Sequence, residues 1–175
     1  MTNVKQGLLH VYTGDGKGKT TAAFGLAMRA RGKNLKVCII QFMKGILTNE
    51  VKSAKNLGID VFQFGRDSFV NKAFLAKADI NIAGEGLDFI NDIVLKNVYD
   101  LIILDEVNNA INFKLVSIDD ILKIIIFRPI NLEMVLTGRD AHTELIKIAD
   151  YVTEMKEIKH PYKTNRTMAR DGIEY

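Results

Sequence analysis

The sequence predicts an α/β domain with a doubly wound, mostly parallel sheet and helices on both faces. Short β-branched runs alternate with helix-like segments along the whole chain, and this alternation requires crossover connections between parallel strands. The runs at 36–42 and 101–104 are apolar enough for strands that are buried on both faces. At 175 residues, the chain fits a single domain over 1–175.

The first half of the chain is expected to hold three strands and two helices. In chain order they lie at 7–12, 20–30, 36–42, 50–56 and 60–64. The first strand ends at a glycine cluster, which is a typical strand boundary. Gly32 stops the first helix and Gly58 stops the second, since glycine favours the conformations that end a helix.

The second half is expected to hold three helices and three strands. In chain order they lie at 71–97, 101–104, 118–127, 132–136, 142–148 and 151–155. Gly84 and Gly86 weaken the middle of the long first helix. Ser117 is a suitable N-cap for the next helix, and Pro129 ends that helix because the residue before a proline disfavours helical geometry.

Composition and charge exclude several classes of protein. One cysteine excludes a disulfide scaffold and a four-cysteine zinc site, and a net charge of +3 is too small to indicate a nucleic-acid or membrane surface. No apolar stretch approaches the roughly 18 residues of a membrane span. His10, His142 and His160 lack metal-ligand spacing, so we expect structural or surface roles for them. The first residues lead into a strand without a signal peptide, and we expect a cytoplasmic protein.

A glycine-rich segment, TGDGKGKTT at 13–21, lies between the first strand and the first helix. Glycines let backbone N–H groups turn toward an anion, and a helix N-terminus adds favourable partial charge. The segment matches the second half of the P-loop pattern G-x-x-x-x-G-K-[ST], with Thr13 at the first glycine position. It predicts a fold of the P-loop NTPase, RecA-like type, and a Mg–nucleotide site. The expected binding residues are Gly14, Asp15, Gly16, Lys17, Gly18, Lys19, Thr20 and Thr21.

Two acidic residues, Asp105 and Glu106, follow the apolar strand at 101–104. An acid at this place emerges at the carboxyl edge of a parallel sheet, where ligands bind. It can hold Mg²⁺ directly or through water, because that cation keeps several waters. Arg139 follows the strand at 132–136 and reaches the same edge, either as a phosphate or substrate contact or as a solvated loop arginine.

These motifs, in their order, resemble the bacterial P-loop-type ATP:corrinoid adenosyltransferases. The likeness begins with VYTGDGKGKTTAAFG at 11–25. It continues through VCIIQFMKG at 37–45, LDE at 104–106, LTGR at 136–139, ADYVTEM at 149–155, KHPY at 159–162 and GIEY at 172–175. It therefore covers nearly the whole chain.

The resemblance implies transfer of the 5′-deoxyadenosyl group of ATP to the Co(I) of a corrinoid, with triphosphate leaving. Co(I) is a strong nucleophile, so alignment and stabilisation of the leaving group suffice without a general base. By resemblance, Lys19 and Glu106 are catalytic, while Thr20, Asp105 and Glu106 hold Mg²⁺. A homodimer and a flavoprotein-type reductant that supplies Co(I) are also implied.

The corrinoid side departs from the family pattern. Some members place two aromatic residues on the segment corresponding to 66–71, beside the corrinoid. Phe69 fits the first, but the second, often Trp, falls near Asn71 in a chain without Trp, and Phe74 is another candidate. Longer relatives also cover the site with an N-terminal segment, which we expect to be missing here. A P-loop ATPase and an ATP-gated binding protein are the alternative functions.

Overall fold

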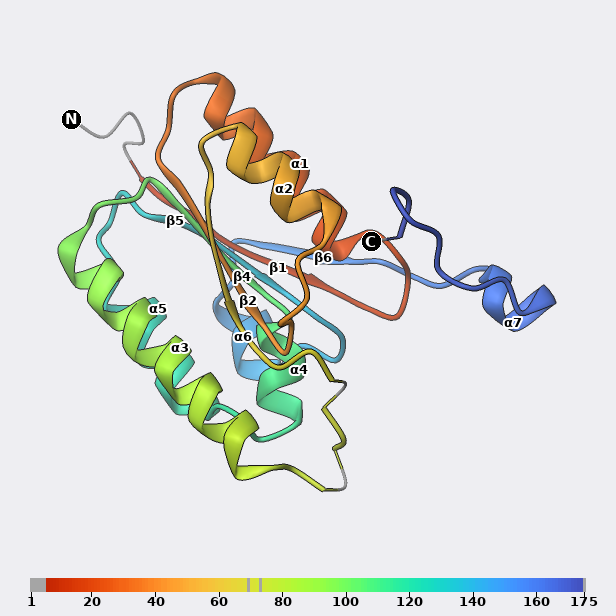
Figure 1. Cartoon of the computed structure of the whole chain (residues 1–175). Helices are drawn as coiled ribbons and strands as arrows, with labels where there is room; N and C mark the ends of the chain where they lie inside the picture. The colour runs from red at the N-terminus through yellow and green to blue at the C-terminus, as the bar shows by residue number, and fades with distance from the viewer. Residues whose placement is uncertain (1–5, 69, 73, 175) are drawn as a thin grey trace.

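The computed structural model describes residues 6–68, 70–72 and 74–174, which form a six-stranded sheet between layers of helices (Figure 1). The strands are β1 (Leu9–Thr13), β2 (Val37–Phe42), β3 (Asp60–Phe64), β4 (Leu101–Asp105), β5 (Glu133–Thr137) and β6 (Tyr151–Glu154). Their order across the sheet is β3-β2-β4-β5-β1-β6, and every neighbouring pair is parallel. The predicted doubly wound α/β fold is confirmed, and the single domain over 1–175 stays a prediction.

The helices cover both faces of the sheet (Figure 1). One face carries α1 (Lys19–Gly32) and α2 (Asn49–Asn56), and the other carries α3 (Lys77–Lys96), α4 (Val107–Asn112), α5 (Ile118–Phe127) and α6 (Thr143–Ile148). The short helix α7 (Pro161–Asn165) extends away from the sheet. Among the described residues, no helix is long and apolar enough to cross a membrane, and the expected cytoplasmic location stays a prediction.

The strand order determines where polar side chains can meet. β5 separates β1 from β4, so the carboxyl ends of these three strands lie next to one another. They end at Thr13, Thr137 and Asp105, and all three side chains are buried. β2 and β4 are buried along their whole length because helices cover both of their faces.

Helix α3 differs from the predicted helix at 71–97, since it begins only at Lys77. Ala76, just before it, has an extended backbone. Side-chain hydrogen bonds connect the preceding loop to the first turn of α3. Gly86 lies inside α3, where it allows close approach to the sheet. A Cβ atom there would lie 3.1 Å from Phe42 Cε1 and 3.0 Å from Phe64 Cγ.

Two short helices, α4 and α7, were not predicted. Helix α4 has six residues and begins after Glu106, whose backbone is left-handed with φ 63°. Such a conformation is uncommon for a residue other than glycine, so no propensity pattern indicates it. Helix α7 has five residues, which is too short for a periodic pattern.

An ion pair anchors the loop between β3 and α3. Arg66 Nε and Nη2 donate to the two carboxylate oxygens of Asp79 at 2.6 and 2.8 Å. Asp79 lies in the first turn of α3 and is only 4% exposed. The hydrogen bond from Arg66 lowers the pKa of Asp79 below its ordinary value. The pair therefore fixes the start of this loop against α3.

Replacing Asp79 with Asn is expected to lower the Tm by several degrees at neutral pH, because an amide cannot accept both guanidinium hydrogen bonds. The pKa of Asp79 is lowered in the folded state, so its ionised form stabilises the fold above the ordinary value of 3.8 and this stabilisation is lost as the pH falls. Thermal unfolding should show a constant Tm difference above about pH 5 and a smaller one below it.

The matched control for this prediction is Glu85→Gln, which neutralises an exposed carboxylate on the same helix. It should leave the Tm close to that of the wild type. A Tm difference for Asp79→Asn that grows as the pH falls would contradict the assigned ion pair.

Candidate functional site

The phosphate loop at 14–18 connects β1 to α1 and packs against the end of β6. Gly14 and Gly18 have φ angles of 92° and 120°, which glycine adopts without strain. The N–H of Gly16 donates to the carbonyl oxygen of Met155 at 2.6 Å. A Cβ atom at Gly14 or Gly16 would lie 2.5 or 2.6 Å from that same oxygen. The turn and the close contact with Met155 therefore require these glycines.

Thr13 replaces the first glycine of the P-loop pattern, and its contacts give the reason. Its side chain is buried, and Oγ1 accepts a hydrogen bond from the N–H of Ala141 at 3.0 Å. Its carbonyl oxygen accepts a hydrogen bond from the N–H of Met155 at 2.8 Å. Thr13 thus fastens the chain after β5 and the end of β6 to the start of the phosphate loop.

A cavity of about 380 Å³ opens over this loop, and we refer to it as the phosphate cavity. It is lined by Asp15, Gly16, Lys17, Gly18, Lys19, Thr20, Thr21, Glu106, Asn109, Arg139, His160 and Glu174. Lys19 Nζ donates to the carbonyl oxygens of Gly14 and Gly16 at 2.5 and 2.8 Å. Burial lowers the pKa of Lys19, while the charge of Glu106 opposes this change. A bound phosphate would offer this ammonium group anionic acceptors in place of the two carbonyls.

Asp105, at the end of β4, is fully buried and accepts four hydrogen bonds. Its Oδ1 accepts from the hydroxyls of Thr20 at 2.9 Å and Thr137 at 2.7 Å. Its Oδ2 accepts from Gln41 Nε2 at 3.0 Å and Lys44 Nζ at 2.8 Å. Burial opposes ionisation, but the charge of Lys44 and these hydrogen bonds hold the pKa of Asp105 below its ordinary value. The carboxylate is therefore ionised and fully satisfied.

Glu106 differs from Asp105 in its hydrogen bonds and in the direction in which its pKa is changed. Its N–H donates to Thr137 Oγ1 at 3.0 Å, and its left-handed backbone turns the chain from β4 into α4. Its side chain lines the phosphate cavity and accepts no hydrogen bond from the described residues. Burial and the charge of Asp105 raise the pKa of Glu106.

The structure brings Thr20, Asp105 and Glu106 together, as the sequence predicts. The Thr20 hydroxyl and the Glu106 carboxylate both line the phosphate cavity, and oxygen ligands beside phosphates fit Mg²⁺. Asp105 already has four donors, so it fits an indirect contact through water. The described part of the chain holds no cluster of three or more His, Cys, Asp or Glu side chains suited to a metal. Among the three predicted metal ligands, Thr20 and Glu106 are thus the ones at this cavity that could contact a magnesium ion directly.

Arg139 lies at the phosphate cavity and its side chain is 57% exposed, so the expected phosphate or substrate contact and the alternative of a solvated loop arginine both stay predictions. Its N–H donates to Asn109 Oδ1 at 2.7 Å, and its Nε lies 3.4 Å from Asp15 Oδ1. Asn109 was missed because α4 was not predicted. His160 accepts a hydrogen bond from the N–H of Tyr162 as the N-cap of α7, which is a structural role, and it also lines the cavity. Its place in the KHPY motif was the signal that could have indicated this second position.

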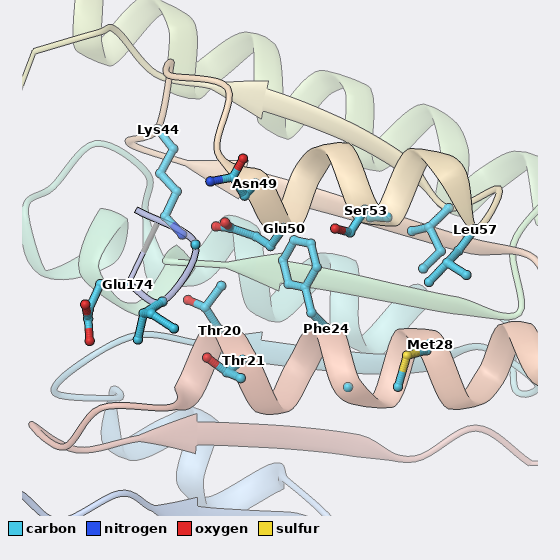
Figure 2. A pocket seen from close by; sticks show the side chains of 15 residues that line it. Thr20, Thr21, Phe24, Met28, Lys44, Asn49, Glu50, Ser53, Leu57 and Glu174 are labelled. Carbon is cyan, nitrogen blue, oxygen red and sulfur yellow. The ribbon is translucent and has the colours of Figure 1, made fainter. Parts of the chain in front are cut away.

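A second cavity of about 500 Å³ lies beside the first, between α1 and α2 (Figure 2). We refer to it as the interhelix cavity. Its apolar wall consists of Phe24, Met28, Ala54, Leu57, Ile59 and Ile173. Thr20, Thr21 and Glu174 line both cavities and form the border between them. The sequence analysis did not predict this cavity, because its residues are scattered from α1 to the end of the chain.

The C-terminal segment, residues 171–174, lies along one side of the border between the two cavities. Glu174 accepts a hydrogen bond from Lys17 Nζ at 2.9 Å, and Asp171 accepts one from Asn49 Nδ2 at 2.5 Å. The segment therefore connects the phosphate loop to α2.

On the expected corrinoid side, Phe69 lies outside the described residues, and Phe74 is 82% exposed in the loop before α3.

The fold and the phosphate loop define a P-loop nucleotide-binding protein of the α/β class. The fold is similar to that of a solved structure, the KaiC-like protein PH0186 from Pyrococcus horikoshii OT3. The TM-score is 0.57 at 14% sequence identity, over 88% of this chain and 75% of that protein. The predicted fold type is thereby confirmed.

Comparison of the sequence with known proteins gives a narrower assignment. Residues 5–175 match the family described as ATP:corrinoid adenosyltransferase BtuR/CobO/CobP. The chain is 30% identical to the corrinoid adenosyltransferase of Escherichia coli K12, over 98% of this chain and 87% of the relative. It is 31% identical to that of a Sinorhizobium species, over 98% and 81%. It belongs to the ATP:corrinoid adenosyltransferase family.

This chain covers a smaller share of one further relative. An uncharacterized protein of Nostoc is 32% identical over 96% of this chain, which spans 48% of the length of that protein. The family assignment confirms the predicted resemblance and supports ATP-dependent adenosyl transfer to a corrinoid.

Replacing Thr137 with Val is expected to lower the free energy of unfolding by about 1–3 kcal/mol. The change keeps the side-chain volume but removes a donor to Asp105 and the acceptor of the Glu106 N–H. Urea unfolding measures the difference. The control is Thr153→Val on the exposed edge strand β6. Equal stability of Thr137→Val and the wild type would contradict the hydrogen-bond network assigned to Asp105.

Proposed function

We propose that this chain transfers the 5′-deoxyadenosyl group of ATP to the Co(I) centre of a corrinoid and releases triphosphate. The observation that carries this proposal is the pair of adjoining cavities. One is lined by a phosphate loop, and the other has a largely apolar wall suited to an organic group. A molecule that fills both has its phosphates at one side of the Thr20–Thr21 border and its organic part at the other.

The phosphate cavity supplies several groups that bind a triphosphate. The loop at 14–18 presents backbone N–H groups at the start of α1, and Lys19 and Arg139 add positive charge. Thr20 and Glu106 would hold Mg²⁺, with Asp105 behind them. The bound ion would neutralise charge on the leaving triphosphate. The proposed catalytic residues are accordingly Lys19 and Glu106.

The reaction needs no proton transfer from the protein. The electron pair of Co(I) forms the bond to the 5′-carbon, and the pair of the breaking C–O bond leaves with the triphosphate. Cobalt is thereby oxidised from Co(I) to Co(III). The protein has to align cobalt with carbon and stabilise the departing charge. This agrees with a site in which Asp105 is fully hydrogen-bonded and has no free electron pair for a base.

Three partners complete the proposal. The corrinoid is the second substrate, either a biosynthetic intermediate or scavenged cobalamin. A flavoprotein-type reductant would supply Co(I), and the chain would act as a homodimer. The last two rest on the family relation alone.

A P-loop ATPase is the second candidate, and one observation favours it. The Glu106 carboxylate faces the phosphate cavity without a hydrogen-bond partner among the described residues, and burial raises its pKa. Such a carboxylate can orient or deprotonate an attacking water molecule.

An anaerobic assay with ATP and a chemically reduced corrinoid separates the two candidates. We expect absorbance changes from a light-sensitive Co–C product, together with inorganic triphosphate in equal amount. Lys19→Ala should lose both nucleotide binding and turnover, because the ammonium group contacts the phosphates. Formation of ADP and phosphate without a Co–C bond would contradict adenosyl transfer and support the ATPase.

A further inference from the structure

Lys44 occupies a position that neither nucleotide motif explains. It lies in the loop after β2, and its side chain reaches toward Thr20 at the start of α1 (Figure 2). It lines the interhelix cavity, whereas Lys19 lines the phosphate cavity. The two lysines therefore line different cavities, while Thr20 and Thr21 line both.

The backbone around Lys44 is held firmly. Met43 has a φ of 59°, and its N–H donates to the carbonyl oxygen of Phe64 at 3.0 Å. Gly45 packs so closely that a Cβ atom would lie 2.6 Å from the carbonyl carbon of Arg66. Arg66 is in turn fixed by Asp79. The ammonium group of Lys44 is thus placed in advance of substrate binding, as electrostatic stabilisation of a transition state requires.

Lys44 also keeps free hydrogen-bonding capacity. An ammonium group has three N–H donors, and the contact with Asp105 Oδ2 at 2.8 Å uses one of them. The side chain is 26% exposed, and it opens to the interhelix cavity. A negatively charged oxygen at the border can therefore bind Lys44 without breaking its contact with Asp105.

We propose that Lys44 is a second catalytic lysine, which stabilises the charge that develops on the triphosphate oxygen as its bond to the 5′-carbon breaks. This inference rests on the proposed adenosyl transfer. ATP that occupies both cavities has the 5′-carbon where the phosphate chain meets the nucleoside, and Lys44 flanks that border. The C–O electron pair stays on this oxygen, which gains one negative charge as the Co–C bond forms.

The two lysines would then act at different stages. Lys19 contacts phosphates whose charge is already present in bound ATP, so it favours substrate and transition state alike. Lys44 faces the one oxygen whose charge increases during the reaction. Only an interaction that strengthens between substrate and transition state accelerates the chemical step. Free triphosphate carries this charge in full, so it reports on Lys44 without any turnover.

The test compares the Kd of inorganic triphosphate with the Kd of ATP by titration calorimetry. Lys44→Met should raise the Kd of triphosphate on the order of tenfold more than the Kd of ATP, because it removes a charge-assisted hydrogen bond present only after bond cleavage. Lys44→Arg, which keeps the charge, should restore most of the preference. The matched control is Lys55→Met, which removes an exposed lysine from α2 and should change neither Kd.

The double variant Lys44→Met/Asp105→Asn covers the case in which Asp105, left buried without its partner, unfolds the single variant. A lysine that only neutralised Asp105 would leave the ratio of the two Kd values as in the wild type, and the double variant would then restore both Kd values. Either result would overturn the proposal. Persistent loss of the triphosphate preference in the double variant supports it. These titrations contain no corrinoid, so failure of the proposed function would appear separately, as absence of a Co–C product with the wild type.

Discussion

The buried carboxylate of Asp105 is the interaction on which the rest of the site depends. An ionised group without access to water is tolerated only when donors satisfy it. Here the donors come from β2, the loop after β2, β5 and α1. The requirement of one side chain therefore brings the ends of three strands and the start of the phosphate-binding helix to a single point. The order of the strands, with β4 between β2 and β5 and with β1 next to β5, makes this convergence possible.

The same convergence gives the two adjacent acids different properties. Asp105 is held ionised by Lys44 and its hydrogen bonds, whereas Glu106 is left without a partner in the described part of the chain and close to the charge of Asp105. Asp105 can organise Thr20, Thr137 and Lys44 but has no free position for a substrate. Glu106 can meet a metal ion or water in the phosphate cavity. A reaction that needs alignment and charge stabilisation, but no base, suits this arrangement.

The sequence predicts the features of this site that follow from local pattern, and it misses those that depend on tertiary contacts. The glycine-rich loop and the acid after an apolar strand are local, and both lie where the sequence places them. Helix α4 was missed because it depends on the left-handed backbone of Glu106, which tertiary contacts hold. Lys44 resembles any loop lysine until β2 and β4 are paired. The interhelix cavity has no local signal, since α1, α2 and the C-terminal segment meet only in the folded chain.

The central claim is that Asp105 is an ionised organiser and Glu106 is the free acid of the site. Isotope-edited NMR of the side-chain carboxyl carbons across a pH series tests it most directly. Asp105 should stay ionised below its ordinary pKa of 3.8, and Glu106 should titrate above its ordinary pKa of 4.5. Titration of Asp105 at a higher pH than Glu106 would contradict the division of roles between them.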